Sequence, residues 1–522
     1  MRLCAKNFFG PQPGKPICAA SKVFSRIQTV RKRQISPSFN RRKTSIGRTL
    51  ATHEWRQWVW GALSCLRDLT YASKRQNFIV MRKDFKPPVK EPGPKARPRD
   101  RRSFWLVPSQ KDAALAEDML FAQGYACRPE PFFGPARVLT LEPEPLGRSL
   151  AAHFGLIYIQ DRSSMLPPLL LDPEPGSRVL DMCASPGGKT GLLALLVGPS
   201  GFVLANEPNK SRLAVLRRNL VHMNLAHVHT CSCPGEDVPL LENAWPYILL
   251  DPPCSGWGTA EKHPKVVRLW RGEKIRPLIA LQKRLLAAAA RLLKPGGRLM
   301  YSTCTTNPAE NEDQAIFVRD TLGLDLTALP RPPGFDFLEP AQPGLEGCLR
   351  VRGGPGEGQG FFLACFTRPK DTFSRSGEVL QGPDNHLPGP ELFKQDAAPK
   401  GAVCLENLPS GGIYCLKDRV FFGHEKALAA LPPDFPWQGF PLGRLGAGKF
   451  RPHPRARLLL PPYASGRGVR VESLEPLLGL VSGQSLRPEG LEGEAGFAGL
   501  YYKDLPLCWL RIKAGRVLWS DR

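Results

Sequence analysis

The stretch that decides the fold is Arg178-Val179-Leu180-Asp181-Met182-Cys183-Ala184-Ser185-Pro186-Gly187-Gly188-Lys189-Thr190. Its first four residues form a short apolar run that ends in an acid, as is typical of a buried strand. The glycines that follow allow backbone N–H groups to approach a ligand where the next helix begins. The stretch therefore predicts one strand–loop–helix unit of an α/β sheet, with a binding loop in the middle.

Strands and helices alternate on both sides of the binding loop. Further strands are predicted at residues 201–207, 228–232, 247–251, 298–302 and 361–367, and helices at residues 209–223 and 277–293. A stop signal for the second helix, Pro295-Gly296-Gly297, follows it, and Asn307, Pro308 and Glu310 predict a capping box that opens another helix. Such repeats predict a parallel, doubly wound sheet with ligands at the carboxyl ends of its strands.

The remaining domains are predicted from changes in composition. Residues 103–175 contain a helical pattern and strand patterns, which indicate a small α+β domain before the main domain at 176–370. Residues 371–395 are polar and Pro-rich and are interpreted as a linker. Residues 396–522 alternate short strand patterns with Gly/Pro turns, which predicts a mixed β domain.

The positive charge is concentrated at one end of the chain. Residues 1–102 hold 25 Lys and Arg against 5 Asp and Glu, whereas the other 420 residues hold 47 against 42. Three interpretations of residues 1–80 stay open: a basic arm that binds RNA, a transit peptide, or a translated upstream stretch with Met81 as the true start. Residues 81–102 are Pro- and Lys/Arg-rich and are interpreted as a linker.

The binding loop favours a nucleoside cofactor without a polyphosphate. Gly188, Lys189 and Thr190 match half of a phosphate-binding P-loop, but Cys183 stands where its leading glycine belongs. A dinucleotide G-x-G-x-x-G pattern is missing as well. Glu207 ends the second predicted strand, where an acid in such folds bonds ribose hydroxyls. S-adenosylmethionine fits this combination.

Two cysteines end neighbouring predicted strands. The fourth strand ends in Asp251-Pro252-Pro253-Cys254 and the next in Thr303-Cys304, so both thiols are expected to face one pocket. An aromatic residue at position 254 would have indicated methylation of an amino group. A thiol instead suits carbon 5 of cytosine, which becomes nucleophilic after a thiolate adds at carbon 6. Asp251 is placed to hydrogen-bond ring nitrogen 3, and the dipole of the helix from Asn307 would favour the Cys304 thiolate.

Together these features resemble the Sun/RsmB/RsmF family of RNA cytosine-5 methyltransferases, over about residues 103–370. The matching motifs are Tyr158-Ile159-Gln160-Asp161-Arg162-Ser163-Ser164-Met165, residues 181–190, Asp251-Pro252-Pro253-Cys254-Ser255-Gly256, Tyr301-Ser302-Thr303-Cys304 and Glu310-Asn311-Glu312. The resemblance implies a Rossmann-like methyltransferase sheet behind a small N-terminal domain.

The resemblance also implies roles for individual residues. Cys304 would be the nucleophile, Cys254 would assist proton removal and enzyme release, and Lys189 would reach the catalytic centre. The residues implied to bind S-adenosylmethionine are Cys183, Ala184, Ser185, Pro186, Gly187, Gly188, Lys189, Glu207 and Asp251. One departure concerns the acid that the family places after its third strand for the adenine. That position falls on Pro234, and Glu236 or Asp237 would have to substitute.

The substrate and partners follow from the same resemblance. Residues 396–522 resemble the PUA-like RNA-binding end of RsmF-type enzymes, so 16S ribosomal RNA is the expected substrate. The first alternative is a cytosine-5 methyltransferase that acts on transfer RNA. The second alternative is a non-catalytic RNA-binding ribosome-assembly factor. Several scattered thiols without metal-binding spacing predict a reducing, cytoplasmic protein without a metal. No apolar run reaches membrane-spanning length, so we expect no membrane partner, and we expect a monomer.

Overall fold

The computed structural model describes residues 102–107, 110–259, 266, 272–340, 342–354, 358–370, 403–446, 449–463, 468–491 and 494–520. The predictions for residues 1–80, for nearly all of the linker 81–102 and for the linker 371–395 lie outside these ranges. Within the described part, no helix is long and apolar enough to cross a membrane.

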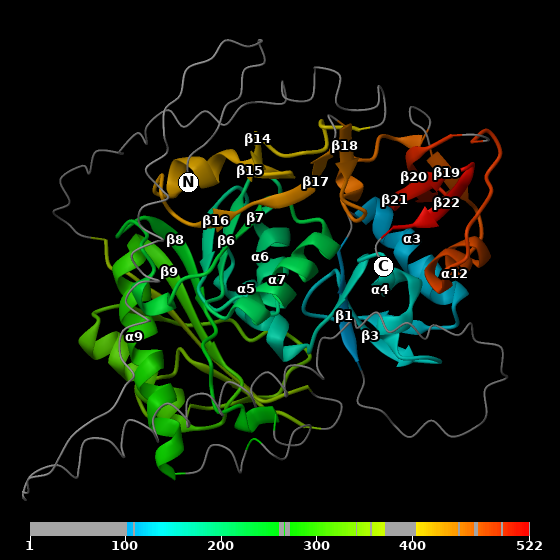
Figure 1. The fold of residues 1–522 in the computed structure, drawn as a ribbon. Coiled ribbons are helices and arrows are strands. Elements are labelled where there is room, and N and C mark those ends of the chain that lie inside the picture. Colours follow the sequence, from blue (N-terminus) through cyan, green and yellow to red (C-terminus); the bar gives the residue numbers. More distant parts are fainter. Residues whose placement is uncertain are drawn as a thin grey trace, which may run out of the picture. The chain divides into compact units, whose positions relative to one another are not determined.

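A central parallel sheet organises the chain (Figure 1). Five strands pair in parallel in the order β7-β6-β5-β8-β9. Their bounds are β5 Arg178–Asp181, β6 Phe202–Asn206, β7 Val228–Cys231, β8 Trp245–Leu250 and β9 Leu293–Thr303. The prediction of an α/β, Rossmann-like sheet is confirmed. Because the chain order reverses between β5 and β8, the carboxyl ends of these two strands flank the crevice where such sheets bind ligands.

Antiparallel strands extend the sheet at both sides. β13 (Phe361–Thr367) pairs with β9, and β12 (Leu349–Val351), β11 (Phe337–Leu338) and β10 (Asp325–Thr327) continue beyond it. At the other side β16 (Trp437–Gln438) pairs with β7, although more than 200 residues separate the two strands. The C-terminal part of the chain thus completes the central sheet.

Helices cover both faces of the sheet, and each face has its own apolar core. On one face α5 (Leu166–Leu171), α6 (Gly188–Val197) and α7 (Lys210–Met223) pack over a core that includes Val179 and Leu249. On the other face α9 (Arg276–Leu292) and α10 (Glu312–Ile316) pack over a core that includes Leu180 and Leu250. Because successive strand residues point to opposite faces, apolar side chains at consecutive positions build both cores.

The connection from α9 to β9 differs from the prediction. The helix ends at Leu292, and β9 begins at Leu293 and runs through the Pro295-Gly296-Gly297 signal that was expected to separate the two elements. A Cβ atom on Gly297 would lie 2.8 Å from the Lys294 carbonyl and 3.0 Å from the Pro246 carbonyl. Glycine therefore allows the close approach to β8 that lets the strand start early.

The residues before and after the central sheet share one core. Residues 103–159 form an antiparallel sheet in the order β2-β3-β1-β4 with helix α3 (Gln110–Ala122). Its strands are β1 Ser103–Leu106, β2 Ala126–Pro129, β3 Ala136–Leu141 and β4 Ile157–Ile159. The apolar cluster that contains Phe104 and Leu120 also contains Leu477 of α12 (Glu475–Ser482) and Leu510 of β21 (Leu505–Lys513). Residues 469–519 are thus packed into the N-terminal part of the molecule.

The C-terminal residues form two four-stranded sheets, in the orders β14-β15-β17-β18 and β19-β20-β21-β22. The remaining bounds are β14 Gly411–Leu416, β15 Arg419–His424, β17 Phe440–Gly446, β18 Lys449–Pro452, β19 Gly468–Val471, β20 Gly496–Tyr502 and β22 Arg516–Trp519, with the short helices α4 Leu150–His153 and α11 Glu425–Ala430 elsewhere. This agrees with a mixed β region, and its likeness to a PUA domain stays a prediction.

A buried polar contact joins three parts of the chain. Arg455 donates one hydrogen bond to Nδ1 of His222 in α7, at 2.7 Å, and another to the carbonyl of His153 in α4. The other nitrogen of His222, Nε2, lies 2.7 Å from the carbonyl of Ala152. This arrangement requires a neutral His222 ring whose Nε2 carries the proton.

Protonation of buried histidines should destabilise the fold. Burial is the largest cause of a lowered pKa at His153 (about 3), His222, His227 (about 4), His229 (about 3) and His424. In the unfolded chain these rings take up protons below their ordinary pKa of about 6.5, whereas in the folded chain they do not. The unfolded state therefore binds more protons in acid, and stability should fall as the pH drops.

We expect the free energy of unfolding to decrease between pH 7.5 and pH 5.5, by up to about 1.4 kcal/mol per site for each pH unit below 6.5. Urea unfolding at a series of pH values measures it. In His222→Asn, where the amide oxygen can accept from Arg455, the decrease should be smaller. An equal decrease in the free energy of unfolding of the two proteins would contradict a contribution of His222 to this pH dependence.

Candidate active site

The binding loop lies at the carboxyl end of β5 and is held by α7. The Ser185 hydroxyl donates to the Arg212 carbonyl at 3.1 Å, and Arg212 donates back to the Ser185 carbonyl at 3.0 Å. Asn219 binds the Pro186 carbonyl at 2.8 Å. Gly187 has φ +110°, a conformation that other residues rarely adopt, and it turns the chain into α6. The loop shape is thus fixed by contacts outside the crevice.

Buried acids stand at the ends of β5 and β6. Asp181 is fully buried and accepts a hydrogen bond from Thr190 at 2.7 Å, and burial raises the pKa of its carboxyl to about 7. Glu207 is 1% exposed; one of its oxygens accepts from the Asn209 N–H at 2.9 Å, and the other lies 3.1 Å from Arg212. Burial also raises the pKa of Glu207. Both carboxyls are therefore locked in position.

Lys189 and Asp251 form an ion pair across the switch point, with 2.7 Å between Nζ and Oδ2. The other oxygen of Asp251 accepts from the Ser302 hydroxyl at 2.8 Å. Burial opposes the charge of Lys189, but Asp251 and then Cys304 outweigh it and raise the pKa of the ammonium group. The pair therefore joins the ends of β5, β8 and β9 and keeps a positive charge in the crevice.

The two thiols that were predicted to face one pocket lie in contact. Cys254 follows β8, Cys304 follows β9, and their Sγ atoms are 3.2 Å apart. Both side chains are half-buried. The hydrogen bond to Cys304 and then burial hold the pKa of Cys254 well above its ordinary value. A thiol with a raised pKa keeps its proton, so Cys254 donates when one member of the pair is ionised.

Hydrogen bonds hold together the two loops that carry the thiols. Gly258 donates its N–H to the Cys304 carbonyl at 3.0 Å, and the hydroxyls of Ser255 and Thr305 are 2.7 Å apart. A Cβ atom on Gly258 would lie 2.8 Å from that carbonyl and 2.6 Å from the carbonyl of Gly360. A side chain at position 258 would thus push the thiol loops apart.

Glu310 differs from its predicted role in a capping box. Asn307 does cap, because its Oδ1 accepts from the Ala309 N–H at 3.2 Å, but only a three-residue 3-10 helix (Pro308–Glu310) follows before α10. The Glu310 carboxylate points back into the protein and accepts from the N–H and hydroxyl of Ser255 and from Gln282. The predicted α-helix from Asn307 is therefore replaced by a 3-10 turn, α10 begins only at Glu312, and the buried carboxylate of Glu310 holds the thiol loop.

Other predicted positions take up less central places. Pro234 is exposed, Glu236 pairs with Arg284 of α9 at 3.6 Å, and Asp237 is exposed in a 3-10 turn. Burial raises the pKa of Cys183 well above its ordinary value, so this thiol is a neutral part of the loop wall. The contact for an adenine ring therefore stays open. Sequence reasoning missed the contacts of Ser302 with Asp251 and of Gln282 with Glu310, because a serine or glutamine in an element carries no signal of its partner.

The chemistry of these groups fits a nucleoside better than a polyphosphate. The backbone of loop 183–188 and the carboxylates of Glu207 and Asp251 can bind hydroxyl and amino groups. The crevice cation, Lys189, is already held by Asp251. Among the described residues no cluster of His, Cys, Asp and Glu that could hold a metal ion occurs.

Glu310→Gln tests how the thiol loop is held. The glutamine amide would place an NH₂ group against the N–H and O–H groups that now donate to the carboxylate. We therefore expect a loss of about 2 kcal/mol in the free energy of unfolding. Chemical denaturation measures it. The matched control is Glu339→Gln, an exposed carboxylate paired with Arg331, which should change stability by less than about 0.5 kcal/mol. Equal effects would contradict the role of Glu310.

Comparisons with known proteins cover the central sheet. The family model described as 16S rRNA methyltransferase RsmB/F matches residues 168–367. A relative named ribosomal RNA small subunit methyltransferase F, from Shewanella amazonensis, is 36% identical over 252 residues, 47% of this chain and 53% of its own length. A relative named tRNA (cytosine(49)-C(5))-methyltransferase, from Pyrococcus abyssi, is 33% identical over 235 residues, 43% of this chain and 74% of its own length.

One solved structure, titled a methyltransferase homologue from Pyrococcus horikoshii, is 32% identical with a TM-score of 0.46, and the match covers 51% of this chain and 86% of that one. The chain spans about half the length of the bacterial relatives it matches.

Proposed function

The chain belongs to the RsmB/F family of methyltransferases, and on that premise we propose that it transfers a methyl group from S-adenosylmethionine to carbon 5 of a cytosine in RNA. The observation that carries the proposal is the thiol pair, with 3.2 Å between Cys254 and Cys304 at the carboxyl ends of adjacent strands. Carbon-5 methylation requires a thiolate that adds to the ring and a separate group that takes up a proton. An amino-group methyltransferase would have no use for this pair.

The bound cofactor would supply an electrophilic methyl group. Residues 183–188, Lys189, Glu207 and Asp251 would hold it, because they line the crevice between β5 and β8 and offer the carboxylates and backbone groups that a nucleoside needs. Asp251 would also face ring nitrogen 3 of the cytosine, and it would accept a hydrogen bond from that nitrogen once the nitrogen carries a proton, because an ionised carboxylate only accepts. The ion pair with Lys189 and the hydrogen bond from Ser302 fix its carboxylate for that contact.

The two thiols would act in sequence. The Cys304 thiolate forms a bond to carbon 6, and the carbon 5–carbon 6 electron pair becomes available at carbon 5 for the methyl group. A base then removes the proton from carbon 5, the double bond re-forms, and the sulfur–carbon 6 bond breaks to release the Cys304 thiolate. Cys254 would be that base: it would first give its own proton to solvent and then, as a thiolate, take up the proton from carbon 5.

Adduct formation would itself prepare Cys254 for this step. The hydrogen bond to Cys304 is the largest cause of the raised pKa of Cys254, and the charge of Cys304 adds to it. In the adduct Cys304 is a thioether, so neither effect operates. The pKa of Cys254 should then fall, although burial still raises it, so the thiolate that removes the carbon-5 proton would form more readily once the ring is bound.

We propose 16S ribosomal RNA as the substrate, because the matching family model describes 16S rRNA methyltransferases. The relative named for a transfer RNA activity makes transfer RNA the alternative. Incubation with labelled cofactor and separated ribosomal and transfer RNA, followed by nucleoside analysis, tests both. Label in 5-methylcytidine from 16S RNA supports the proposal, whereas label only in N4-methylcytidine, or no label in any RNA, would overturn it.

The cysteine variants should differ in kind. Cys304→Ala lacks the thiolate that adds to carbon 6, so no covalent RNA complex should form. Cys254→Ala should still add but should stall at elimination and accumulate as an adduct. Denaturing gel electrophoresis with RNA and cofactor measures both, and thermal melts check that each variant is folded. An adduct from Cys304→Ala and none from Cys254→Ala would reverse the assignment.

The C-terminal region is proposed to bind RNA as a PUA-like domain. Arg511 and Lys513 are exposed on β21, and Arg516 is exposed opposite Lys513 on β22. Deletion of the region would remove part of a shared core, so surface substitutions are the cleaner test. Arg511→Glu/Lys513→Glu should raise KM for RNA severalfold and leave kcat and cofactor affinity unchanged. Unchanged RNA kinetics would argue against an RNA-binding role of this surface.

A further inference from the structure

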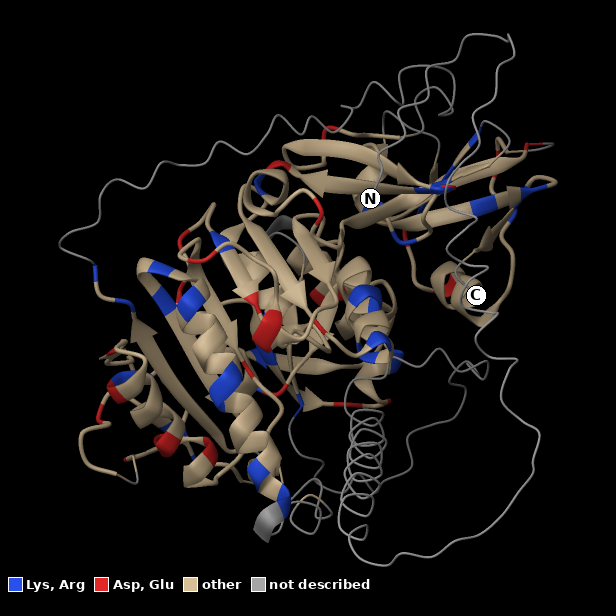
Figure 2. Cartoon of the chain, turned by 60° about the vertical axis from the view of Figure 1, so that its left-hand side comes forward, with Lys and Arg blue, Asp and Glu red and all other residues tan. Residues whose placement is uncertain are grey.

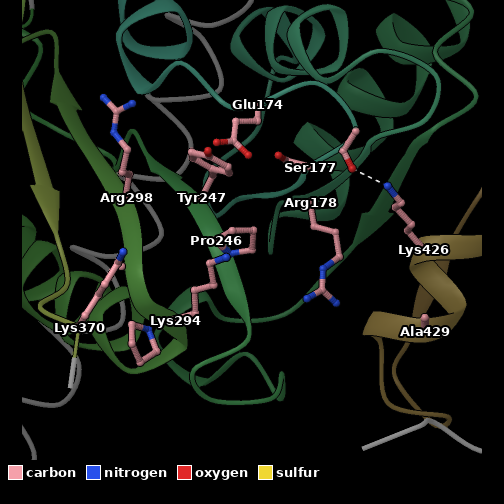
Figure 3. A pocket seen from close by; sticks show the side chains of 13 residues that line it. Glu174, Ser177, Arg178, Pro246, Tyr247, Lys294, Arg298, Lys370, Lys426 and Ala429 are labelled. Carbon is pink, nitrogen blue, oxygen red and sulfur yellow. Dashed lines mark hydrogen bonds between the residues drawn. The ribbon is translucent and has the colours of Figure 1, made fainter. Parts of the chain in front are cut away.

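A cavity lies at the opposite edge of the central sheet from the thiols. It has a volume of about 610 Å³ and is lined by residues at the amino ends of β5, β8 and β9, by Lys370 just after β13, and by Lys426 of α11 (Figure 3). The proposed reaction uses none of these residues. β8 has six residues, so the two edges are roughly 20 Å apart at about 3.3 Å per residue.

The walls of this amino-edge cavity are strongly cationic. Five of the lining side chains are basic, and one, Glu174, is acidic; the basic ones are Arg178, Lys294, Arg298, Lys370 and Lys426. Among the described residues none of the five forms an ion pair with a carboxylate. In Figure 3, Arg298, Lys294 and Lys370 lie on one side of the cavity and Arg178 on the other. The charge therefore surrounds a cavity instead of being spread over a flat surface.

Three of the cations are anchored to backbone carbonyls in the walls. Arg178 donates to the carbonyl of Ala244 at 3.2 Å, and Arg298 donates to the carbonyl of Leu170 at the end of α5 at 3.0 Å. Lys426 donates to the carbonyl of Gly176. These bonds hold the side chains in place without neutralising them, and burial lowers the pKa of Arg178, as expected for a guanidinium kept away from water.

The rim is different, because Lys294 and Lys370 are exposed and bound to no described acid. Anchored guanidinium groups inside and flexible ammonium groups at the mouth suit an anion that is itself partly exposed. Five basic side chains against one acid would repel a cationic ligand. A phosphate group fits the charge, and successive phosphates along a backbone can meet the wall and the rim cations together.

We infer that the amino-edge cavity binds phosphate groups of the RNA substrate, about 20 Å from the cytosine that the proposed reaction methylates. That the polyanion is RNA rests on the proposed function. That the cavity suits phosphate groups rests on its own basic side chains. Two segments of one structured RNA would thus contact opposite edges of the sheet. Contacts of this kind carry no base specificity and set the orientation of the RNA on the protein.

The test variant is Lys294→Glu/Lys370→Glu in the full chain, because both side chains are exposed and lie outside the catalytic crevice. The control is Arg128→Glu/Arg148→Glu, which changes the net charge equally at two exposed positions outside the cavity. We measure the Kd for 16S RNA fragments over a range of salt concentrations. The test variant should bind at least about tenfold more weakly than the control, with a salt slope smaller by about two. Glu174→Gln should bind RNA more tightly than the unaltered chain.

Tripolyphosphate distinguishes the RNA backbone from a free phosphate ligand. It should bind the unaltered chain, compete with RNA and fail to bind the test variant. Loss of tripolyphosphate binding with RNA affinity equal to the control would overturn the assignment to RNA, and equal behaviour of both variants toward both ligands would overturn the site. Because the readout is binding, a failure of methyl transfer would contradict the proposed function and leave this result standing.

Discussion

The parallel pairing of β8 with both β5 and β9 is the constraint on which the site depends. It brings the ends of three strands together, so that Lys189, Asp251 and Ser302 form one hydrogen-bonded chain although up to 113 positions separate them. The same pairing places the two thiol loops side by side. Neither loop is a regular element, and the contacts of Glu310 and Gly258 supply the rigidity that secondary structure would otherwise provide.

Sequence reasoning succeeded where the signal was local. The strand at residues 178–181 and the helix that follows the glycines could be predicted because buried strands and their turns have a compositional signature. The strand-end positions of Cys254 and Cys304 followed from the same pattern. A shared pocket for the two thiols was expected from these positions, and the structure adds that their Sγ atoms are 3.2 Å apart.

Sequence reasoning failed where partners are distant. The Asn307–Glu310 spacing matches a capping box, yet tertiary hydrogen bonds from Ser255 and Gln282 compete for the carboxylate and win because the site is fully buried. The shared core of the N-terminal and C-terminal residues has no signature in either segment alone. The pairing of β16 with β7 likewise joins two-residue and four-residue strands that no local pattern could connect.

Basic and acidic residues occur on many elements of the described chain (Figure 2), but the two edges of the central sheet differ in charge. At the carboxyl edge of the sheet, acids and thiols surround one lysine, as the proposed nucleoside and cytosine chemistry requires. At the amino edge, five cations surround a cavity with one acid. The two edges thus offer separate surfaces to one ligand, one for chemistry on a base and one for phosphate groups.

The central claim is that Cys304 forms the covalent bond to the base. RNA in which 5-fluorocytidine replaces cytidine would trap that bond, because the fluorine at carbon 5 cannot be removed as a proton and elimination is blocked. Mass spectrometry of peptides from the trapped complex identifies the attached residue. Our account predicts the nucleotide on Cys304, and its attachment to Cys254, or no attachment in a complex that binds RNA and cofactor, would contradict it.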